Sequence, residues 1–348
     1  MSDIGFEESS DYFKEMEIFT GQKTVRVLIE NSNDADIWND ALPIKDNLVF
    51  EYATVLDVAE EFNLKVAEGC TQLNKIGHYH LGDNLIMCKD SDYSYIAYLM
   101  KKIIDNSTAS YVISDYIFET IVHSKENIVF YENFVLNHFA NRVKVHPSLI
   151  NAKAPWLKLF YFNFSKIIFT PMLKLIYHDS ILHFRLKKNQ IGFNKINSIF
   201  KGLRNIPLNN IQDFNVFFES RSWKRVEREI SAYEKTIDKI ILENKLTNEI
   251  DFIVSKIGDY NVGDNNFYHF YKGHFVEEIF ESIFKKYLDI IYESEVKLKC
   301  KNLNTERATK MRAEYKNTKK EFDLKDEVRD LNQHNFFSQT YNRLLEMY

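Results

Sequence analysis

Two short, largely apolar runs that each end in carboxylates constrain this chain most. Residues 24–29 lead into Glu30, and residues 84–89 lead into Asp90 and Asp92. Apolar runs of this length are typical of strands buried in a parallel sheet. The carboxyl ends of parallel strands meet at one edge of the sheet, where open α/β folds bind their ligands. The sequence therefore predicts a cluster of carboxylates at that edge.

Such a cluster favours a divalent cation. Carboxylate oxygens are hard ligands that suit Mg²⁺ or Mn²⁺. Clustered carboxylates also repel one another, and a bound cation neutralises that repulsion. We therefore expect Glu30, Asp90 and Asp92 to bind a metal, with Asp34 in support. Asp36 is interpreted as a solvated helix residue.

A second polar segment, Ser124-Lys125-Glu126-Asn127, has the composition of a helix start. Ser124 is expected to cap the first free amides of that helix. Glu126 either completes the metal shell or only stabilises the helix N-terminus, where a negative charge contributes about 0.3–1 kcal/mol. Lys125 and His123 flank it as candidate phosphate contacts, and a solvated lysine and a packed histidine are the alternatives.

Four blocks carry a resemblance to a known family. They are Ile29-Glu30-Asn31-Ser32-Asn33-Asp34, Asp90-Ser91-Asp92-Tyr93, residues 116–127 and residues 268–274. Together they resemble the Toprim-like, OLD-related nucleases of bacterial phage defence, in the AriB-like branch that contains the toxic effector of the PARIS system. The resemblance covers residues 20–140 well and the remainder in outline. Asn31 stands where the family usually has glycine, and Gly69-Cys70 where the branch often has Gly-Lys.

The resemblance implies a Toprim-like sheet, a Mg²⁺-dependent endonuclease and RNA, tRNA in particular, as substrate. It also implies a partner ABC-type ATPase that holds the effector inactive until infection. In such a site Glu30 is a metal ligand or a general base. Lys272 and His274 are expected to meet the scissile phosphate, or else simply to begin a helix at Gly273. Lys75 and Lys89 are candidates for the basic group that Cys70 does not supply.

Two other functions stay open. One is a DNA nuclease of the OLD kind, and the other is a non-catalytic binding module derived from the Toprim fold. The sequence lacks the Gly-rich phosphate loop of P-loop ATPases, so any ATP-driven step is expected to come from the partner. The pair His78 and His80 is interpreted as part of a surface turn instead of a zinc site, because no third ligand lies in register.

Composition excludes other classes. A net charge of −5 argues against a globally basic nucleic-acid binder, although a local basic patch remains possible. Cys70, Cys88 and Cys300 are widely spaced, which favours neither zinc nor disulfides and fits a reducing cytoplasm. The acidic N-terminus differs from a signal peptide. The apolar run 156–177 is interrupted by lysines and a proline, so a buried element is expected instead of a membrane span.

The expected architecture is an α/β, mainly parallel sheet flanked by helices, at residues 20–145, and a mostly helical region at 150–348. Strands are expected at 24–29, 48–54, 84–89 and 116–122. Helices are expected at 34–42, 55–64, 70–78, 94–104 and 124–139, with long amphipathic helices at 222–244 and 268–293 and a charged arm at 301–330. The helical region is expected to bind the substrate or the partner, or to form a homodimer when active.

Overall fold

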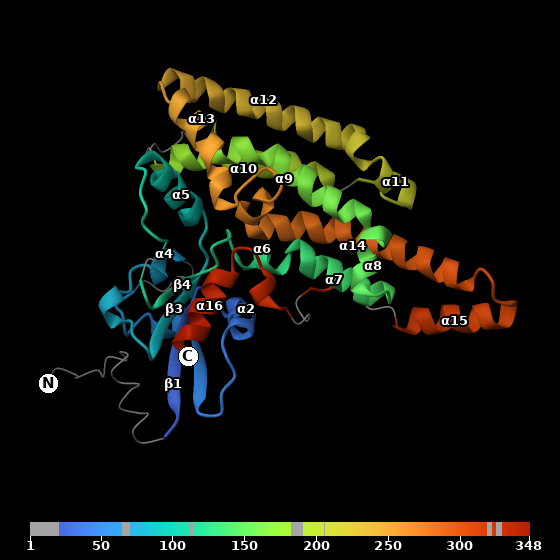
Figure 1. Cartoon of the computed structure of the whole chain (residues 1–348), viewed down its shortest axis with the longest axis horizontal. Helices are drawn as coiled ribbons and strands as arrows, with labels where there is room; N and C mark the ends of the chain where they lie inside the picture. Colours follow the sequence, from blue (N-terminus) through green and yellow to red (C-terminus); the bar gives the residue numbers. More distant parts are fainter. Residues whose placement is uncertain are drawn as a thin grey trace. The chain divides into compact units, whose positions relative to one another are not determined.

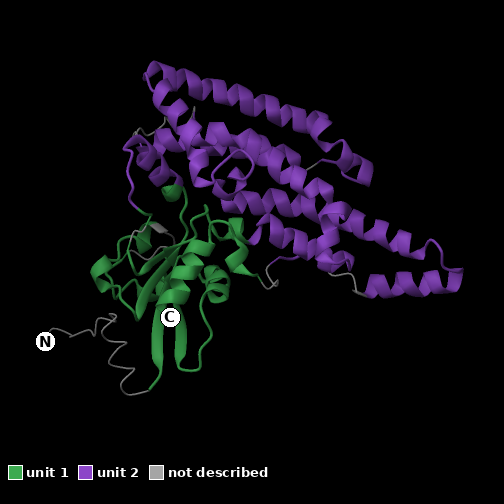
Figure 2. Ribbon diagram, in the orientation of Figure 1, with its two compact units in different colours: residues 1–95, 110–128, 328–348 green, residues 96–109, 129–327 purple. Residues whose placement is uncertain are grey.

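The computed structural model describes residues 21–64, 70–111, 114–181, 191–204, 206–318, 322–324 and 329–348. The chain forms two compact units (Figure 2). The sheet unit consists of the described residues among 1–95, 110–128 and 328–348, and the helical unit consists of those among 96–109 and 129–327. Each unit buries apolar side chains of its own.

The sheet unit contains a four-stranded, all-parallel sheet with the order β2-β1-β3-β4 (Figure 1). The strands are β1 (Lys23–Ile29), β2 (Leu48–Thr54), β3 (Leu85–Lys89) and β4 (Ile117–Glu119). The predicted α/β fold class with a parallel sheet, followed by a helical region, is confirmed. Strands β1, β2 and β3 lie where the apolar runs predicted them. The strand expected at 116–122 is shorter: β4 ends at Glu119, and the chain then bends at Ile121, whose φ is +64°.

The two central strands explain where a ligand site can form. From β1 the chain moves outward to β2, then returns across β1 to form β3 on the other side. The strand order therefore reverses between β1 and β3. The carboxyl ends of the strands at such a switch point are the usual ligand-binding position of an open α/β sheet. Every residue of β3 is buried, which fits a central parallel strand.

The helices of the sheet unit are short. They are α2 (Ala35–Ala41), α3 (Val55–Val58), α4 (Cys70–Leu73) and α6 (Lys125–Val129). The helices expected at 55–64 and 70–78 end earlier than predicted, and the one expected at 124–139 is two helices. The second of these, α7 (Glu132–Val143), begins after Tyr131, whose extended backbone (φ −58°, ψ 131°) interrupts the helix. Tyr131 is buried, and its ring packs on Phe134.

The C-terminal segment 329–348 completes the sheet unit. It contains a 3₁₀ turn, Leu331–Gln333, and helix α16, Ser338–Met347. On α16, Thr340 donates a hydrogen bond to the carbonyl oxygen of Glu119 at 2.6 Å, and the guanidinium of Arg343 lies over the ring of Phe118. Strand β4 is therefore held by residues more than two hundred positions away in the chain.

The compact units differ from the two sequence ranges expected for the domains. The C-terminal segment belongs to the sheet unit, although the helical region was expected to extend to residue 348. Helix α7 and most of α5 (Ser94–Ile104) belong to the helical unit, although both lie within 20–145. Sequence order alone could not reveal this, because both differences arise from contacts between distant segments.

The helical unit is built on long helices. Its further helices are α8 (Pro147–Lys153), α9 (Pro155–Ile176), α10 (Phe193–Phe200), α11 (Ile211–Asn215), α12 (Arg221–Glu243), α13 (Thr247–Lys256), α14 (Gly273–Cys300) and α15 (Thr305–Thr318). The amphipathic helix expected at 222–244 is α12. It buries Trp223, Val226, Ile230, Tyr233, Ile237 and Ile241, which recur every three or four residues.

Helix α9 is the core of this unit. Together with the π-helical turn Tyr177–Ile181 it is long and apolar enough to cross a membrane, but 61% of its most apolar window is buried inside the structure. Its rings at Phe160 and Phe164 contact Phe280 of α14. The greater part of this window is buried by other residues of the structure, which agrees with the buried element that the sequence predicted.

Helix α14 also differs from its sequence interpretation. The aromatic residues of this helix, which lies in the region expected to bind a partner or a second copy, are buried within the helical unit: Phe275, Phe280, Phe284 and Tyr287 are all buried. The apolar face of the amphipathic α14 is therefore part of the hydrophobic core of the helical unit. The charged arm contains α15, most of whose side chains are exposed.

Acid should destabilise the sheet unit through His334. Its Nδ1 accepts hydrogen bonds from the amides of Phe336 and Phe337 at 3.2 and 3.1 Å, and burial lowers its pKa to about 3. In the unfolded chain the His334 side chain has the ordinary histidine pKa of about 6.5, so it binds a proton at a higher pH than it does in the folded chain. The stability that this difference provides is complete above about pH 6.5 and is lost as the pH falls below it. We therefore expect His334 to make the free energy of unfolding of the sheet unit about 2 kcal/mol lower at pH 5 than at pH 7.

The measurement is guanidinium denaturation followed by Trp38 fluorescence, with Trp156 and Trp223 replaced by phenylalanine. His334→Asn keeps an acceptor near the Nδ1 position without titrating, and should flatten this part of the pH dependence. His78→Asn, at an exposed histidine of the same unit, is the matched control. Equal pH dependence in the parent and His334→Asn would contradict the prediction.

Candidate metal centre

The ends of β1 and β3 meet at a direct contact between the two acidic motifs. Glu30 directly follows β1, and Asp90 directly follows β3. The backbone N–H of Asp90 donates to Oε1 of Glu30 at 2.9 Å. Because β1 pairs with β3 in parallel, both residues leave the sheet at the switch-point edge. The structure therefore brings together two of the carboxylates that the sequence predicted to converge.

Asp34 is fixed by the turn that follows β1. Residues Ser32–Asp34 form a 3₁₀ turn capped by Asn31, whose side chain accepts from the amide of Asn33, while the amide of Asn31 donates to Oδ2 of Asp34 at 3.0 Å. Asn31 has an extended backbone with φ −153°. Asn31 stands where the resembled family usually has glycine, but here the residue has no positive φ, and its side chain forms the turn as a cap.

Lys125 links Asp34 to Asp90. Its Nζ lies 2.5 Å from Oδ1 of Asp34, and its backbone N–H donates to Oδ1 of Asp90 at 3.1 Å. Asp34 is only 5% exposed, and a buried charge is costly unless it is paired. Lys125 is the counterion of this carboxylate. Lys125, expected as a phosphate contact or a solvated residue, instead pairs with a carboxylate of the site.

Asp92 is held in an uncommon backbone conformation. Its φ is +47°, in the left-handed region, and its amide donates to the carbonyl oxygen of His123 at 2.8 Å. The carboxylate is 60% exposed, and its Oδ1 lies 3.8 Å from Nε2 of His123. His123 itself is buried and packs edge-on against Tyr93. The solvent-facing side chain of the motif is therefore Asp92, and His123 supports it.

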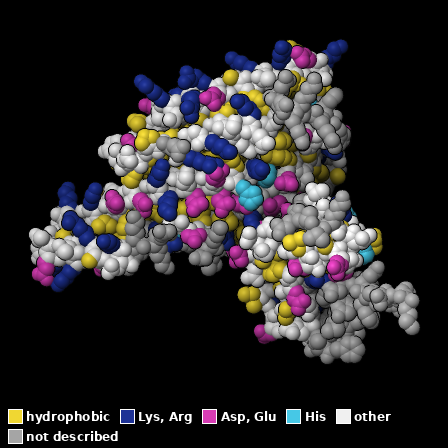
Figure 3. All heavy atoms as spheres, turned by 180° about the vertical axis from the view of Figure 1, so that it is seen from behind, with side chains coloured by type: hydrophobic (Ala, Val, Ile, Leu, Met, Phe, Trp, Pro, Cys, Tyr) yellow, Lys and Arg dark blue, Asp and Glu magenta, His cyan; other side chains and the backbone are white. Residues whose placement is uncertain are grey.

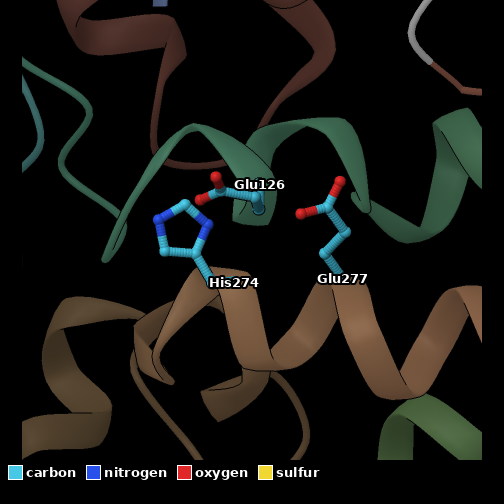
Figure 4. Close-up of side chains that lie close together, drawn as sticks. All are labelled: Glu126, His274 and Glu277. Atoms are coloured by element: carbon cyan, nitrogen blue, oxygen red, sulfur yellow. The ribbon is translucent and has the colours of Figure 1, made fainter. Parts of the chain in front are cut away.

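Glu126 lies in the first turn of α6 (Figure 4). The hydroxyl of Ser124 donates to Oε2 of Glu126 at 2.5 Å, and the amide of Ser124 donates to Oδ1 of Asn127 at 3.1 Å. Ser124 therefore supports this turn mainly as a donor, whereas the sequence predicted its hydroxyl as a cap for free amides. The predicted helix start is in place, but Asn127 provides the cap contact.

The carboxylates act on one another through Asp90. The pKa of Asp90 is raised well above its usual range, first by burial and then by the negative charges nearby. Those charges belong, in order of effect, to Glu30, Glu126, Asp34 and Asp92. All five predicted metal ligands of the sheet unit are therefore close enough to interact electrostatically. A site that penalises its own negative charge in this way favours a bound cation.

The donor set fits Mg²⁺ or Mn²⁺. Glu30, Asp90 and Asp92 present carboxylate oxygens at one edge of the sheet, and such oxygens are the ligands these cations prefer. Hydrogen bonds from backbone amides already orient Glu30 and Asp90. Asp34 accepts hydrogen bonds from protein groups at both oxygens, so its main contribution here is to hold Lys125 and the turn.

Lys89 does not act as a substitute for the missing basic group. It is only 7% exposed, and its Nζ lies 3.1 Å from Oε1 of Glu119 and 2.7 Å from Oδ1 of Asn74. Lys75 lies on the surface, where it donates to Gln72. Gly69 and the side chain of Cys70 lie outside the described residues. Lys89 is instead part of a buried polar cluster with Glu119.

Sequence reasoning missed two polar residues that contact the Asp90-Ser91-Asp92 motif. The hydroxyl oxygen of Thr120 accepts a hydrogen bond from the amide of Ser91, and the carboxylate of Glu119 accepts one from the hydroxyl of Ser91. The available signal was the polar pair that directly follows the apolar residues Ile117 and Phe118 of a buried strand. The end of β4 was thus a third strand end to consider beside β1 and β3.

Lys272 and His274 belong to the helical unit. Lys272 is the residue before α14, and His274 lies in the first turn of that helix; both side chains are exposed. His274 and Glu277 are three residues apart on α14 and therefore lie on the same side of it (Figure 4). This arrangement matches the helix start that was the alternative interpretation, and a contact with phosphate remains a prediction.

Two further predictions concern surface residues. His78 and His80 lie in a short 3₁₀ turn, where His78 is exposed, in agreement with the predicted surface turn. Asp36 is an exposed residue of α2, also as predicted.

Comparison with known proteins gives no family. No protein-family model matches this chain, and no curated protein matches its sequence. Any function proposed for the chain therefore rests on the geometry of the site and on the resemblance of the motifs.

Removing the charge of Asp90 should stabilise the chain without metal. Folding raises the pKa of the Asp90 carboxyl. The stability linked to this group is therefore complete at a pH below its pKa in the unfolded chain, and it is lost as the pH rises through its pKa in the folded chain. Asp90→Asn should therefore melt a few degrees higher than the parent at pH 7 in the presence of a chelator. Adding Mg²⁺ should raise the melting temperature of the parent but not of Asp90→Asn.

Thermal unfolding measured with chelator and with Mg²⁺ tests both parts. Asp36→Asn, at an exposed carboxylate of the same unit, should behave as the parent does. A lower melting temperature for metal-free Asp90→Asn would contradict the electrostatic account of the site.

Proposed function

We propose that this protein is a Mg²⁺-dependent endonuclease of Toprim type. The observation that carries the proposal is the group of carboxylates at the β1–β3 switch point. There the backbone amide of Asp90 donates to Glu30, and the pKa of Asp90 is raised first by burial and then by four neighbouring acids. Such a site is suited to a divalent cation, and divalent cations are the usual catalysts of phosphodiester cleavage at carboxylate clusters.

Each residue of the site has a distinct part in the proposed chemistry. Glu30, Asp90 and Asp92 would hold the ion, which when bound supplies Lewis-acid polarisation of a phosphodiester oxygen and lowers the pKa of water or of a ribose hydroxyl. Glu30 is also a candidate general base, as the motif resemblance implies, because its carboxylate lies beside Asp90 at the end of β1. Lys125 holds Asp34 and orients Asp90 through its amide.

The charge distribution supports a polyanionic substrate. The full sequence ranges to which the sheet unit belongs, 1–95, 110–128 and 328–348, include 24 Asp and Glu and 10 Lys and Arg, a net charge of −14. The ranges to which the helical unit belongs, 96–109 and 129–327, include 26 Asp and Glu and 35 Lys and Arg, a net charge of +9. These two values give the −5 of the whole chain. Lys and Arg are spread over the visible face of the helical unit (Figure 3). A basic unit joined to an acidic metal-binding unit suits a nucleic acid, whose phosphates need cationic partners.

The substrate and biological role follow from the motif resemblance as proposals. RNA, tRNA in particular, is favoured over DNA, and cleavage would make the protein a toxic effector of phage defence in the cytoplasm. A partner ABC-type ATPase would hold it inactive until infection. A homodimer as the active form is part of the same proposal, with a contact surface other than the apolar face of α14, which is buried in the helical unit.

The principal test is cleavage by the purified chain. With Mg²⁺ it should cut tRNA, single-stranded RNA or DNA, and chelator should stop the reaction. Glu30→Ala should lower the rate by about a hundredfold or more, because a catalytic metal supplies several kcal/mol of transition-state stabilisation. Asp36→Ala, which removes an exposed carboxylate on α2, should leave the rate unchanged. Expression without the partner should arrest growth, and Glu30→Ala should relieve the arrest.

Other results would redirect the proposal. Cleavage of DNA but not RNA would favour the OLD-like nuclease. Binding of nucleic acid or a partner without cleavage of any substrate in Mg²⁺ or Mn²⁺, together with equal toxicity of folded Glu30→Ala, would favour a non-catalytic binding module.

A further inference from the structure

The turn Asp90-Ser91-Asp92 needs support from outside itself. Asp92 has φ +47°, and a non-glycine residue in the left-handed region costs about 1–2 kcal/mol. Such a conformation persists only where the surroundings impose it. The two carboxylates on either side of Ser91 can bind one cation only if this turn keeps its shape. Neighbouring residues of the sheet unit must therefore impose that shape.

The end of β4 supplies the support. The hydroxyl oxygen of Thr120 accepts a hydrogen bond from the amide of Ser91 at 3.0 Å and donates to the carbonyl oxygen of Val122 at 2.7 Å. The carbonyl oxygen of His123 accepts from the amide of Asp92 at 2.8 Å. Two consecutive amides of the metal-binding turn are thus held by one short segment, residues 120–123. Thr120 is fully buried, so water cannot replace its hydroxyl.

This supporting segment is itself strained. Ile121 has φ +64°, and the left-handed conformation is a clear outlier for a β-branched residue. The bend at Ile121 brings the carbonyl oxygen of Val122 back onto the hydroxyl of Thr120. Two left-handed residues, Ile121 and Asp92, therefore occur in two segments joined by these hydrogen bonds. Strain of this kind concentrates at functional sites, where the surrounding structure enforces it.

Glu119 holds the same turn through the side-chain hydroxyl of Ser91. Its Oε2 accepts from Oγ of Ser91 at 3.3 Å and from the hydroxyl of Tyr111, and its Oε1 lies 3.1 Å from Nζ of Lys89. Glu119 is 4% exposed. Buried ion pairs contribute little net stability, because desolvation offsets the attraction. A buried pair that also contacts the metal-binding turn is better explained by the geometry it imposes there.

We propose that Thr120 and Glu119 are positioning residues that fix the Asp90-Ser91-Asp92 turn in the conformation that binds the cation. This inference rests on the proposed metal site. Thr120 acts on the backbone of the turn and Glu119 on the side chain of Ser91. Neither residue needs to touch the metal or the substrate.

Two substitutions of Thr120 separate the effect of its hydroxyl group from the effect of its side-chain shape. Thr120→Val keeps the shape of the side chain and removes the hydroxyl, whereas Thr120→Ser keeps the hydroxyl and removes a methyl group. If positioning depends on the hydrogen bond, Mn²⁺ affinity of the full chain, measured by electron paramagnetic resonance, should fall about tenfold or more in Thr120→Val. Thr120→Ser should stay near the parent value. Glu119→Gln should also weaken binding, whereas Glu295→Gln, the same change at a buried carboxylate that pairs with Lys153, should not.

A second readout needs no metal. In the chain with chelator, amide hydrogen exchange of the segment around Ser91 and Asp92 should be faster in Thr120→Val than in the parent, and unchanged in Thr120→Ser. Faster exchange throughout the sheet in Thr120→Val, to the same degree as in this segment, would show a merely structural role and overturn the proposal.

The remaining outcomes separate this inference from the function. If the parent binds Mn²⁺ and Thr120→Val binds it equally well, or Thr120→Ser loses as much affinity as Thr120→Val, positioning by the hydroxyl is wrong and the metal site stands. If the parent binds no Mn²⁺ at all, the proposed metal site is wrong and the inference is overturned with it.

Discussion

The parallel pairing of β1 with β3 is the constraint on which the candidate metal centre depends. Arg26, Val27 and Leu28 pair with Leu85, Ile86 and Met87. This register puts Glu30 and Asp90 at matching strand ends, close enough for the Asp90 amide to bond to Glu30. A slip by one residue would turn the side chains of one strand to the opposite face of the sheet. The buried apolar residues of both strands oppose such a slip, so the core and the site share one constraint.

The acidic residues that gather at this edge are neutralised unequally. Lys125 is the counterion of Asp34, and Lys89 is the counterion of Glu119, so these two buried carboxylates are compensated within the chain. The pKa of Asp90, in contrast, is raised by its burial and by the neighbouring acids. Asp34 and Glu119 are thus paired with lysines, whereas a negative charge on Asp90 is unfavourable at the position where we propose that a cation binds.

Local patterns predicted much of this fold, and non-local contacts account for most of the rest. The four strands could be read from apolar runs, and the acidic strand ends from the residues that come after them. The break between α6 and α7 depends on the extended, buried Tyr131, which no periodicity reveals. The contact of Thr340 with Glu119 joins residues far apart in sequence, as does the counterion role of Lys125 for Asp34. The hydrogen bond between Thr120 and Ser91 likewise depends on which strand lies beside β3.

The placement of residues 329–348 in the sheet unit has a consequence for synthesis. A ribosome makes β1 to β4 long before it makes α16, so the nascent sheet lacks the contacts of Thr340 and Arg343 with β4 while the helical unit is being translated. Domains generally fold as units once their segments are available, and closing a long chain segment carries an entropic cost. The strand end that supports the proposed metal-binding turn therefore gains these contacts only after the helical unit has been translated. If the protein is the toxic enzyme proposed above, this order would delay its activity until the helical unit, the proposed partner-binding unit, has been translated.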